Sequence, residues 1–289
     1  MEDFLLHGNS EYGPAKTQFL KDLAALRKIY PEEILALVHK NMDILLKNYV
    51  AWQQSLGVLA KNFGIETADV NKIPGVIEQI SFEKAKKTLL KRRAEKIILG
   101  ISGPGAVGKE IVKDALGFDT VVNTTTRPKR DYEKEDQHYH FVTEAQFRDI
   151  LAQGGFVIDM ERKGRGQYGI QKQDVDQVLS RSKISIIEEN PENLASLGKY
   201  IKIHPECQFI LIYILPPSPI LLHLAARLAG RCQKTGENFR SAIISTLGIR
   251  QLKEFNSISI AIKKEILVVF AVNDDVECIV KKIKDLVTI

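Results

Sequence analysis

The chain has 289 residues, of which 44% are hydrophobic and 27% charged, a composition typical of globular proteins. Its net charge of +5 is too small to predict nucleic-acid binding without a concentrated basic patch. The acidic start predicts no secretory signal, and the longest apolar runs are far shorter than the roughly 20 residues that span a bilayer. Three separated cysteines favour a reducing compartment, so we expect a cytoplasmic protein that does not enter membranes (Cys207, Cys232, Cys278).

Residues 1–96 read as a helical N-terminal region. Four apolar residues recur at helical spacing (Phe19, Leu23, Leu26, Tyr30). Pro31 followed by two glutamates predicts a second helix that runs as far as Gly64. After a turn predicted at Pro74-Gly75, Ser81 is expected to cap a third helix.

That third helix carries a basic run between Lys84 and Lys96, including Arg93. A solvated helix face is the preferred interpretation, and contact with nucleic acid or another acidic partner is the alternative. The apolar stripe of the preceding helix indicates a bundle core, although a protein partner or self-association through this region stays open.

From residue 97 to residue 289 apolar strands alternate with helical patterns, which favours a mainly parallel sheet with helices on both faces. The expected strands are Ile97–Ile101, Val121–Asn123, Ile184–Ile187, Phe209–Ile214 and Ile266–Val272. The expected helices are Lys109–Leu116, Asp174–Leu179, Pro191–Tyr200, Pro219–Leu228, Arg240–Phe255 and Asp275–Leu286. A smaller β-rich insert, at about 124–170, is expected to hold one helix near Thr143–Gln153.

A glycine-rich turn follows the first of these strands. Gly103, Gly108 and Lys109 fit the spacing G-x-x-x-x-G-K, with Gly105 between them. Small residues there let backbone N–H groups surround phosphate oxygens, while the lysine reaches the outer phosphates. The sequence therefore predicts a P-loop of the nucleotide-triphosphatase type. The Ser or Thr that normally follows the lysine and ligates Mg²⁺ is Glu110, so the metal ligand is undetermined.

Downstream segments, taken in order, resemble the guanylate kinase family. These segments are Thr125-Thr126-Arg127-Pro128-Lys129-Arg130, Glu133, His138-Tyr139-His140-Phe141-Val142, Gln167-Tyr168-Gly169, Leu215-Pro216-Pro217-Ser218, Arg227-Leu228-Ala229-Gly230-Arg231 and Val272-Asn273-Asp274-Asp275. The resemblance covers residues 97–289 and leaves the helical N-terminal region unexplained.

The resemblance implies ATP with Mg²⁺ as the phosphoryl donor and GMP as the acceptor. Lys109 would hold the donor phosphates, and the cations that act on the transferring group would be Lys109, Arg127, Arg227 and Arg231. The last two belong to a lid at about 227–240. The acceptor would be bound by Arg127, Arg130, Tyr139, Asp159, Tyr168 and Glu189.

Several positions depart from the family pattern. Ala106 stands where glycine is usual, and Ile170 replaces a serine after the Tyr-Gly turn. The acidic residue that reads guanine would be at Ile158 or Asp159, and a further lid arginine would be Arg240 or Arg250.

Two functions of different classes follow from this pattern. One is an ATP-dependent guanylate kinase, with turnover weakened by Glu110. The other is a catalytically inactive module of the same fold that binds a ligand or a protein. The fold alone does not distinguish these two functions.

Overall fold

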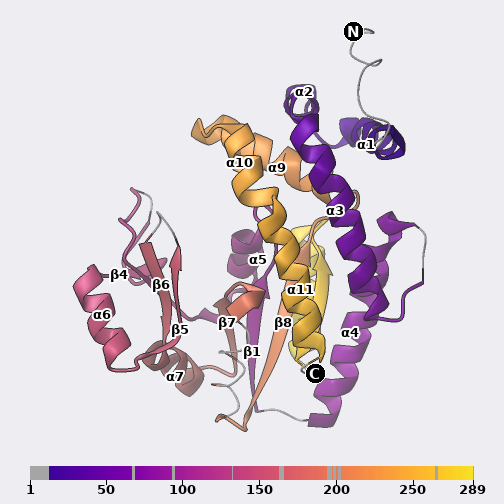
Figure 1. Ribbon diagram of the computed structural model, residues 1–289. Coiled ribbons are helices and arrows are strands. Elements are labelled where there is room, and N and C mark those ends of the chain that lie inside the picture. The colour runs from indigo at the N-terminus through magenta and orange to yellow at the C-terminus, as the bar shows by residue number, and fades with distance from the viewer. Residues whose placement is uncertain are drawn as a thin grey trace.

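The computed structural model describes residues 13–66, 69–92, 95–131, 133–162, 166–193, 197, 200, 203–263 and 266–288. In Figure 1 a central sheet is flanked by helices, a small β-rich insert lies to one side, and the N-terminal helices lie on the opposite side. Arg93 and the side chain of Arg250, both noted in the sequence, lie outside the described part.

The main sheet contains five parallel strands in the order β2-β7-β1-β8-β9. Their bounds are β1 Lys96–Ser102, β2 Asp119–Thr120, β7 Ile184–Glu188, β8 Cys207–Leu215 and β9 Leu267–Val272. Strands β8 and β9 are almost continuously buried, as strands covered on both faces must be. The predicted α/β fold with a mainly parallel sheet is therefore confirmed.

Helices cover both faces of this sheet. In Figure 1, α5 lies behind the sheet and α11 in front of it. The helices are α5 Lys109–Leu116, α7 Lys172–Arg181, α9 Ile220–Thr235, α10 Phe239–Leu247, α11 Ile249–Lys263 and α12 Val276–Val287. The single helix predicted over Arg240–Phe255 is wrong, because the chain breaks at Gly248 and forms α10 and α11. Of the predicted Pro191–Tyr200 helix, the short 3-10 turn Pro191–Asn193 is described and most of the remainder lies outside the described residues.

The insert is a separate four-stranded sheet in the order β4-β3-β6-β5. Its elements are β3 Asn123–Thr125, β4 Tyr139–Phe141, α6 Glu144–Ala152, β5 Phe156–Arg162 and β6 Gly166–Gln171. The predicted helix is confirmed, and Thr143 begins it with a capping box to Gln146. The predicted strand Val121–Asn123 is wrong: the chain leaves the main sheet after β2 and joins the insert at β3.

The N-terminal region is helical, as predicted. It contains α1 Gly13–Ala25, the 3-10 turn Leu26–Lys28, α2 Glu32–Lys40, α3 Met42–Lys61, the 3-10 turn Val70–Lys72 and α4 Ile73–Arg92. The single helix expected from Pro31 to Gly64 is interrupted at Asn41, whose amide donates to the carbonyl of Leu37. The buried face of α3 joins the same apolar core as the main sheet.

Helix α4 covers the outer edge of the sheet at β9. Glu78 and Ser81 accept hydrogen bonds from the backbone N–H groups of Val272 and Phe270, each at 2.9 Å. An edge strand otherwise presents unpaired backbone groups. The predicted N-cap role of Ser81 is wrong, because α4 begins at Ile73 and Ser81 is fully buried within it. Within the described residues, no helix combines the length and apolarity needed to cross a bilayer.

Candidate active site

The glycine-rich loop connects β1 to α5. Gly108 has a φ of +92° and begins the helix in a left-handed conformation that favours glycine. Ala106 also has a positive φ, +65°, although it carries a Cβ atom. The Nζ of Lys109 donates to the carbonyl oxygens of Gly103 (2.8 Å) and Pro104 (3.2 Å). The lysine ammonium thus folds over the loop, where it can meet phosphate oxygens.

Two side chains from outside the loop hold it in place. The carbonyl oxygen of Val107 accepts hydrogen bonds from Asn273 Nδ2 at 2.8 Å and from Arg227 Nη1 at 3.0 Å. Arg227 Nη2 also donates to the Asn273 carbonyl at 2.8 Å. The Val-Asn-Asp-Asp run, which begins at the last residue of β9, was the sequence signal for Asn273, although the sequence did not assign it a role. Arg227, predicted as a lid cation, here supports the base of the loop.

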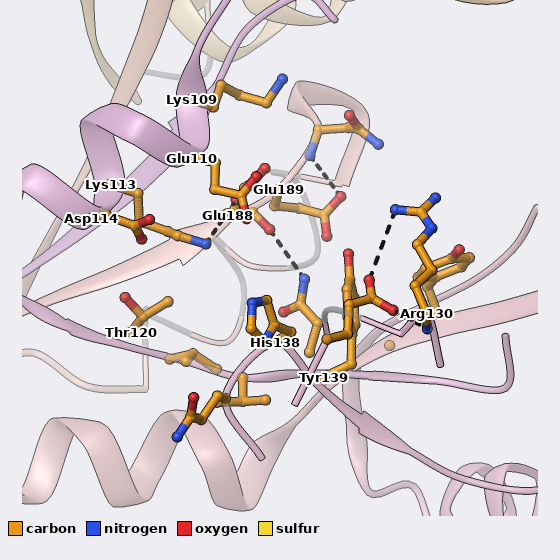
Figure 2. A pocket seen from close by; sticks show the side chains of 18 of the residues that line it. Lys109, Glu110, Lys113, Asp114, Thr120, Arg130, His138, Tyr139, Glu188 and Glu189 are labelled. Atoms are coloured by element: carbon orange, nitrogen blue, oxygen red, sulfur yellow. Dashed lines mark hydrogen bonds and ion pairs between the residues drawn. The ribbon is translucent and has the colours of Figure 1, made fainter. Parts of the chain in front are cut away.

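A cavity of about 550 Å³ lies between the start of α5, the end of β7 and the insert (Figure 2). It brings together five of the predicted site residues: Lys109, Arg130, Tyr139, Tyr168 and Glu189. The remaining predicted residues are not among those that line it, within the described part of the chain. Figure 2 places Lys109 and Glu110 on one side of the space and Arg130 with Tyr139 on the other. The donor and acceptor sides predicted from the sequence thus face a common cavity.

The two arginines of the predicted phosphate clamp have different environments. Arg127 forms a bidentate pair with Glu133, with Nη2 to Oε1 at 2.6 Å and Nη1 to Oε2 at 3.0 Å. Its guanidinium carbon also lies 5.4 Å from the Tyr139 ring centre. The hydrogen bonds from Arg127 lower the pKa of Glu133, and the same pair raises the pKa of Arg127.

Arg130, by contrast, is exposed and lines the cavity. Its backbone N–H donates to Glu133 Oε2 at 2.8 Å, and its Nη1 lies 3.9 Å from Glu133 Oε1. Glu133 is 6% exposed and therefore anchors the loop that presents Arg130. Of the two predicted arginines, Arg130 is the one placed to meet a ligand directly.

Strand alternation decides which residues of β5 face the cavity. Met160 pairs with Tyr168 across the two strands, and both line the cavity. Ile158 pairs with Ile170, and both are buried in the apolar core. Asp159 points to the opposite face of the sheet and is exposed. Neither Asp159 nor the two isoleucines offers a polar atom to the cavity.

Asn123 is a cavity-lining residue that the sequence had not assigned to the site. Its Nδ2 donates to the carbonyl of Glu188 at 3.4 Å, a long contact. Its Oδ1 is buried and has no hydrogen-bond partner among the described residues. A buried acceptor of this kind is costly unless a donor reaches it. Asn123 is thus a candidate contact for an N–H group of a ligand.

Carboxylates outnumber basic side chains in the cavity wall. The acidic residues are Glu110, Asp114, Glu133, Glu188 and Glu189, and the lysines and arginines are Lys109, Lys113 and Arg130. Lys113 pairs with Glu188 at 3.3 Å, and Glu189 accepts hydrogen bonds from its neighbours Asn190 and Asn193. Figure 2 shows Glu110 and Glu188 extending into the same space. Hard carboxylate oxygens are the donors that Mg²⁺ prefers, so this donor set fits that ion.

The remaining predicted lid residues lie away from the cavity. Arg231 pairs with Glu237 at 3.0 Å on the protein surface. Arg240 pairs with Asp43 of α3. The roles of these arginines in catalysis stay predictions.

A buried parallel strand, a glycine-rich turn and a lysine at the start of the next helix define a P-loop nucleotide-binding protein. The model of the family described as guanylate kinase matches residues 94–288. The chain belongs to the guanylate kinase family.

Individual relatives show the extent of the likeness. The guanylate kinase of Clostridium perfringens (strain SM101) is 31% identical over 193 residues, which are 65% of this chain and 81% of that protein. The guanylate kinase of Anaeromyxobacter dehalogenans is 30% identical over 154 residues, 52% of this chain. Those residues are 65% of the Anaeromyxobacter protein, so the chain spans slightly less than two thirds of that relative. The crystal structure of guanylate kinase from Anaplasma phagocytophilum is 19% identical, with a TM-score of 0.44 and coverage of 68% of this chain and 86% of that one.

Proposed function

We propose that this protein binds GMP and transfers the γ-phosphoryl group of ATP to it, with turnover weakened relative to a site that has a hydroxyl after the P-loop lysine. The observation that carries the proposal is the common cavity of Lys109, Arg130, Tyr139 and Tyr168. A cytosolic location fits the three cysteines, which are all free.

In this reaction an oxygen of the GMP phosphate attacks the γ-phosphorus, the bond from that phosphorus to the β-phosphate bridging oxygen breaks, and GDP and ADP result. Arg130 and the hydroxyls of Tyr139 and Tyr168 would bind the acceptor phosphate, and Lys109 the donor phosphates. Mg²⁺ would neutralise charge on the donor phosphates, held by Glu110 with Glu188 or Glu189. Positioning and charge neutralisation are the main requirements, so no covalent nucleophile is needed.

The weakened turnover has two supports. Glu110 adds an anion beside the donor phosphates where a neutral hydroxyl would stand. Arg227 is engaged with the carbonyls of Val107 and Asn273, so it must release both before it can act as a lid cation.

The second candidate function is a binding module without turnover. The excess of carboxylates in the cavity favours it, because anionic walls oppose the binding of a polyphosphate such as ATP beside GMP. The acceptor phosphate could still bind at Arg130, which lies on the insert side.

Calorimetric titration with GMP, together with a coupled assay containing ATP, Mg²⁺ and GMP, separates the two functions. Arg130→Ala should weaken GMP binding by about 10- to 100-fold, the loss typical of a charged hydrogen bond. Lys129→Ala is the matched control, since Lys129 is an exposed cation of the same segment outside the cavity wall. Lys109→Ala should abolish turnover and leave GMP affinity within about twofold. GMP binding without any turnover would favour the module, and absence of GMP binding would refute both the kinase and a module that binds GMP.

A further inference from the structure

Helix α10 is held at both ends by α3 of the N-terminal region. At its start, Arg240 forms a bidentate pair with Asp43, with distances of 2.8 Å and 3.1 Å. At its end, the buried indole of Trp52 donates to the carbonyl of Leu247 at 3.4 Å and packs edge-on against Phe255 of α11. These contacts join segments about 200 residues apart in the sequence.

The end of α10 lies against the phosphate loop. A Cβ atom placed on Gly105 would lie only 2.2 Å from the Thr246 methyl carbon, so the Thr246 side chain would have to move if residue 105 carried a side chain. The cavity wall includes Lys109 and Glu110 but not the loop glycines, within the described residues. Helix α10 therefore covers the loop at Gly105, where Thr246 lies against it.

We propose that Asp43 is a positioning residue: through Arg240 it holds α10 on the phosphate loop and so limits how fast donor phosphates reach that loop. The binding of donor phosphates at this loop, and the identity of the donor as ATP, rest on the proposed function. The covering of the loop rests on Thr246, Gly105 and the contacts of α3. According to this proposal, the N-terminal helical region holds α10 of its own chain in place.

The size of the effect follows from the exposure of the pair. The side chains of Asp43 and Arg240 are 61% and 53% exposed, so the pair is accessible to salt and modest in strength. Its bidentate geometry places it at the upper end of surface pairs. Breaking it should increase the opening of α10 by about two- to fivefold.

Hydrogen exchange on the full chain tests the proposal without any nucleotide. Asp43→Asn should raise the hydrogen-exchange rates of the backbone amides by about two- to fivefold, both in α10 and in the loop of residues 103–109. The control is Glu32→Gln, which removes a carboxylate from another exposed pair of the N-terminal region, Arg27–Glu32. The control should leave both segments unchanged. Faster exchange in α10 with an unchanged loop would overturn the proposal, and so would no change in α10.

Stopped-flow binding of Mg²⁺-tripolyphosphate and of Mg²⁺-ATP supplies the functional measurement. Association should be about two- to fivefold faster in Asp43→Asn than in wild type or Glu32→Gln, with GMP affinity unchanged. An unchanged or slower association would overturn the role of Asp43. If neither probe binds, the proposed kinase activity and the effect on donor access both fail, while hydrogen exchange still decides whether α10 covers the loop.

Discussion

The pair between Arg127 and Glu133 is predicted to be a main determinant of stability in the insert. Glu133 is 6% exposed and accepts three hydrogen bonds, two from Arg127 and one from the N–H of Arg130. In Glu133→Gln, an amide NH₂ faces the guanidinium and the charge of Arg127 loses its counterion. Breaking a buried pair from one side costs about 3–5 kcal/mol. The Arg127 side chain is 13% exposed, so we expect the lower end, about 3 kcal/mol.

Urea unfolding monitored by circular dichroism measures this loss. Asp131→Asn, an exposed carboxylate in the same loop, is the control and should change the unfolding free energy by less than about 0.5 kcal/mol. The double variant Arg127→Met/Glu133→Leu should recover at least half of the loss, because no buried charge is then left unpaired. A cost below about 1 kcal/mol for Glu133→Gln, or a double variant no more stable than the single one, would refute this reasoning.

Four further predictions concern the loop, the cavity and the insert. Glu110→Ser should raise turnover with ATP and GMP at least about tenfold in the coupled assay, with GMP affinity unchanged, because the serine hydroxyl can replace Glu110 as a ligand of the metal while the anion beside the donor phosphates is removed. Ala106→Gly should raise the urea unfolding free energy by about 0.5 kcal/mol, since it relieves a left-handed alanine. Calorimetry should give GMP and AMP affinities within about tenfold of each other, because neither Asp159 nor Ile170 reads the base from the cavity wall. His140 has a pKa raised to about 9, first by its hydrogen bond to Asp174 and then by Asp136. Because this value exceeds that of unfolded histidine, the contribution of His140 to the free energy of unfolding should be fully present below about pH 6.5. The free energy of unfolding should then fall by about 2 kcal/mol as the pH rises through 9, and this loss should be absent in His140→Gln.

The parts of the fold that the sequence predicted best are those with strong local signals. Helix α5 has the bounds expected from the sequence, because Gly108 begins it and Gly117 follows its last residue. Strands β1, β7, β8 and β9 were predicted from apolar runs that are too short to form ordinary helices. The break between α2 and α3 was missed, because the apolar spacing continues across Asn41.

Ser81 shows why long-range contacts escape such reasoning. A serine before a basic helical run resembles an N-cap, yet its hydroxyl accepts from the N–H of Phe270, 189 residues away. The same limit applies to Arg240, whose partner Asp43 lies 197 residues earlier in the chain. Strand alternation, in contrast, was available from the sequence and would have placed the side chains of Asp159 and Met160 on opposite faces of the sheet.

In the proposed site we expect phosphate binding to tolerate sequence change better than base recognition does, for a physical reason. A phosphate dianion is bound by charge, and Arg130 and Lys109 keep that charge whatever the exact backbone placement. A base edge is read by neutral groups at fixed positions, and one residue of register on β5 exchanges Asp159 for Ile158. The buried Oδ1 of Asn123 is a polar atom of the cavity-lining residues that has no hydrogen-bond donor among the described residues. If the proposed GMP site is correct, we expect the acceptor to be selected first by its phosphate, and only secondarily by an N–H group that can reach Asn123.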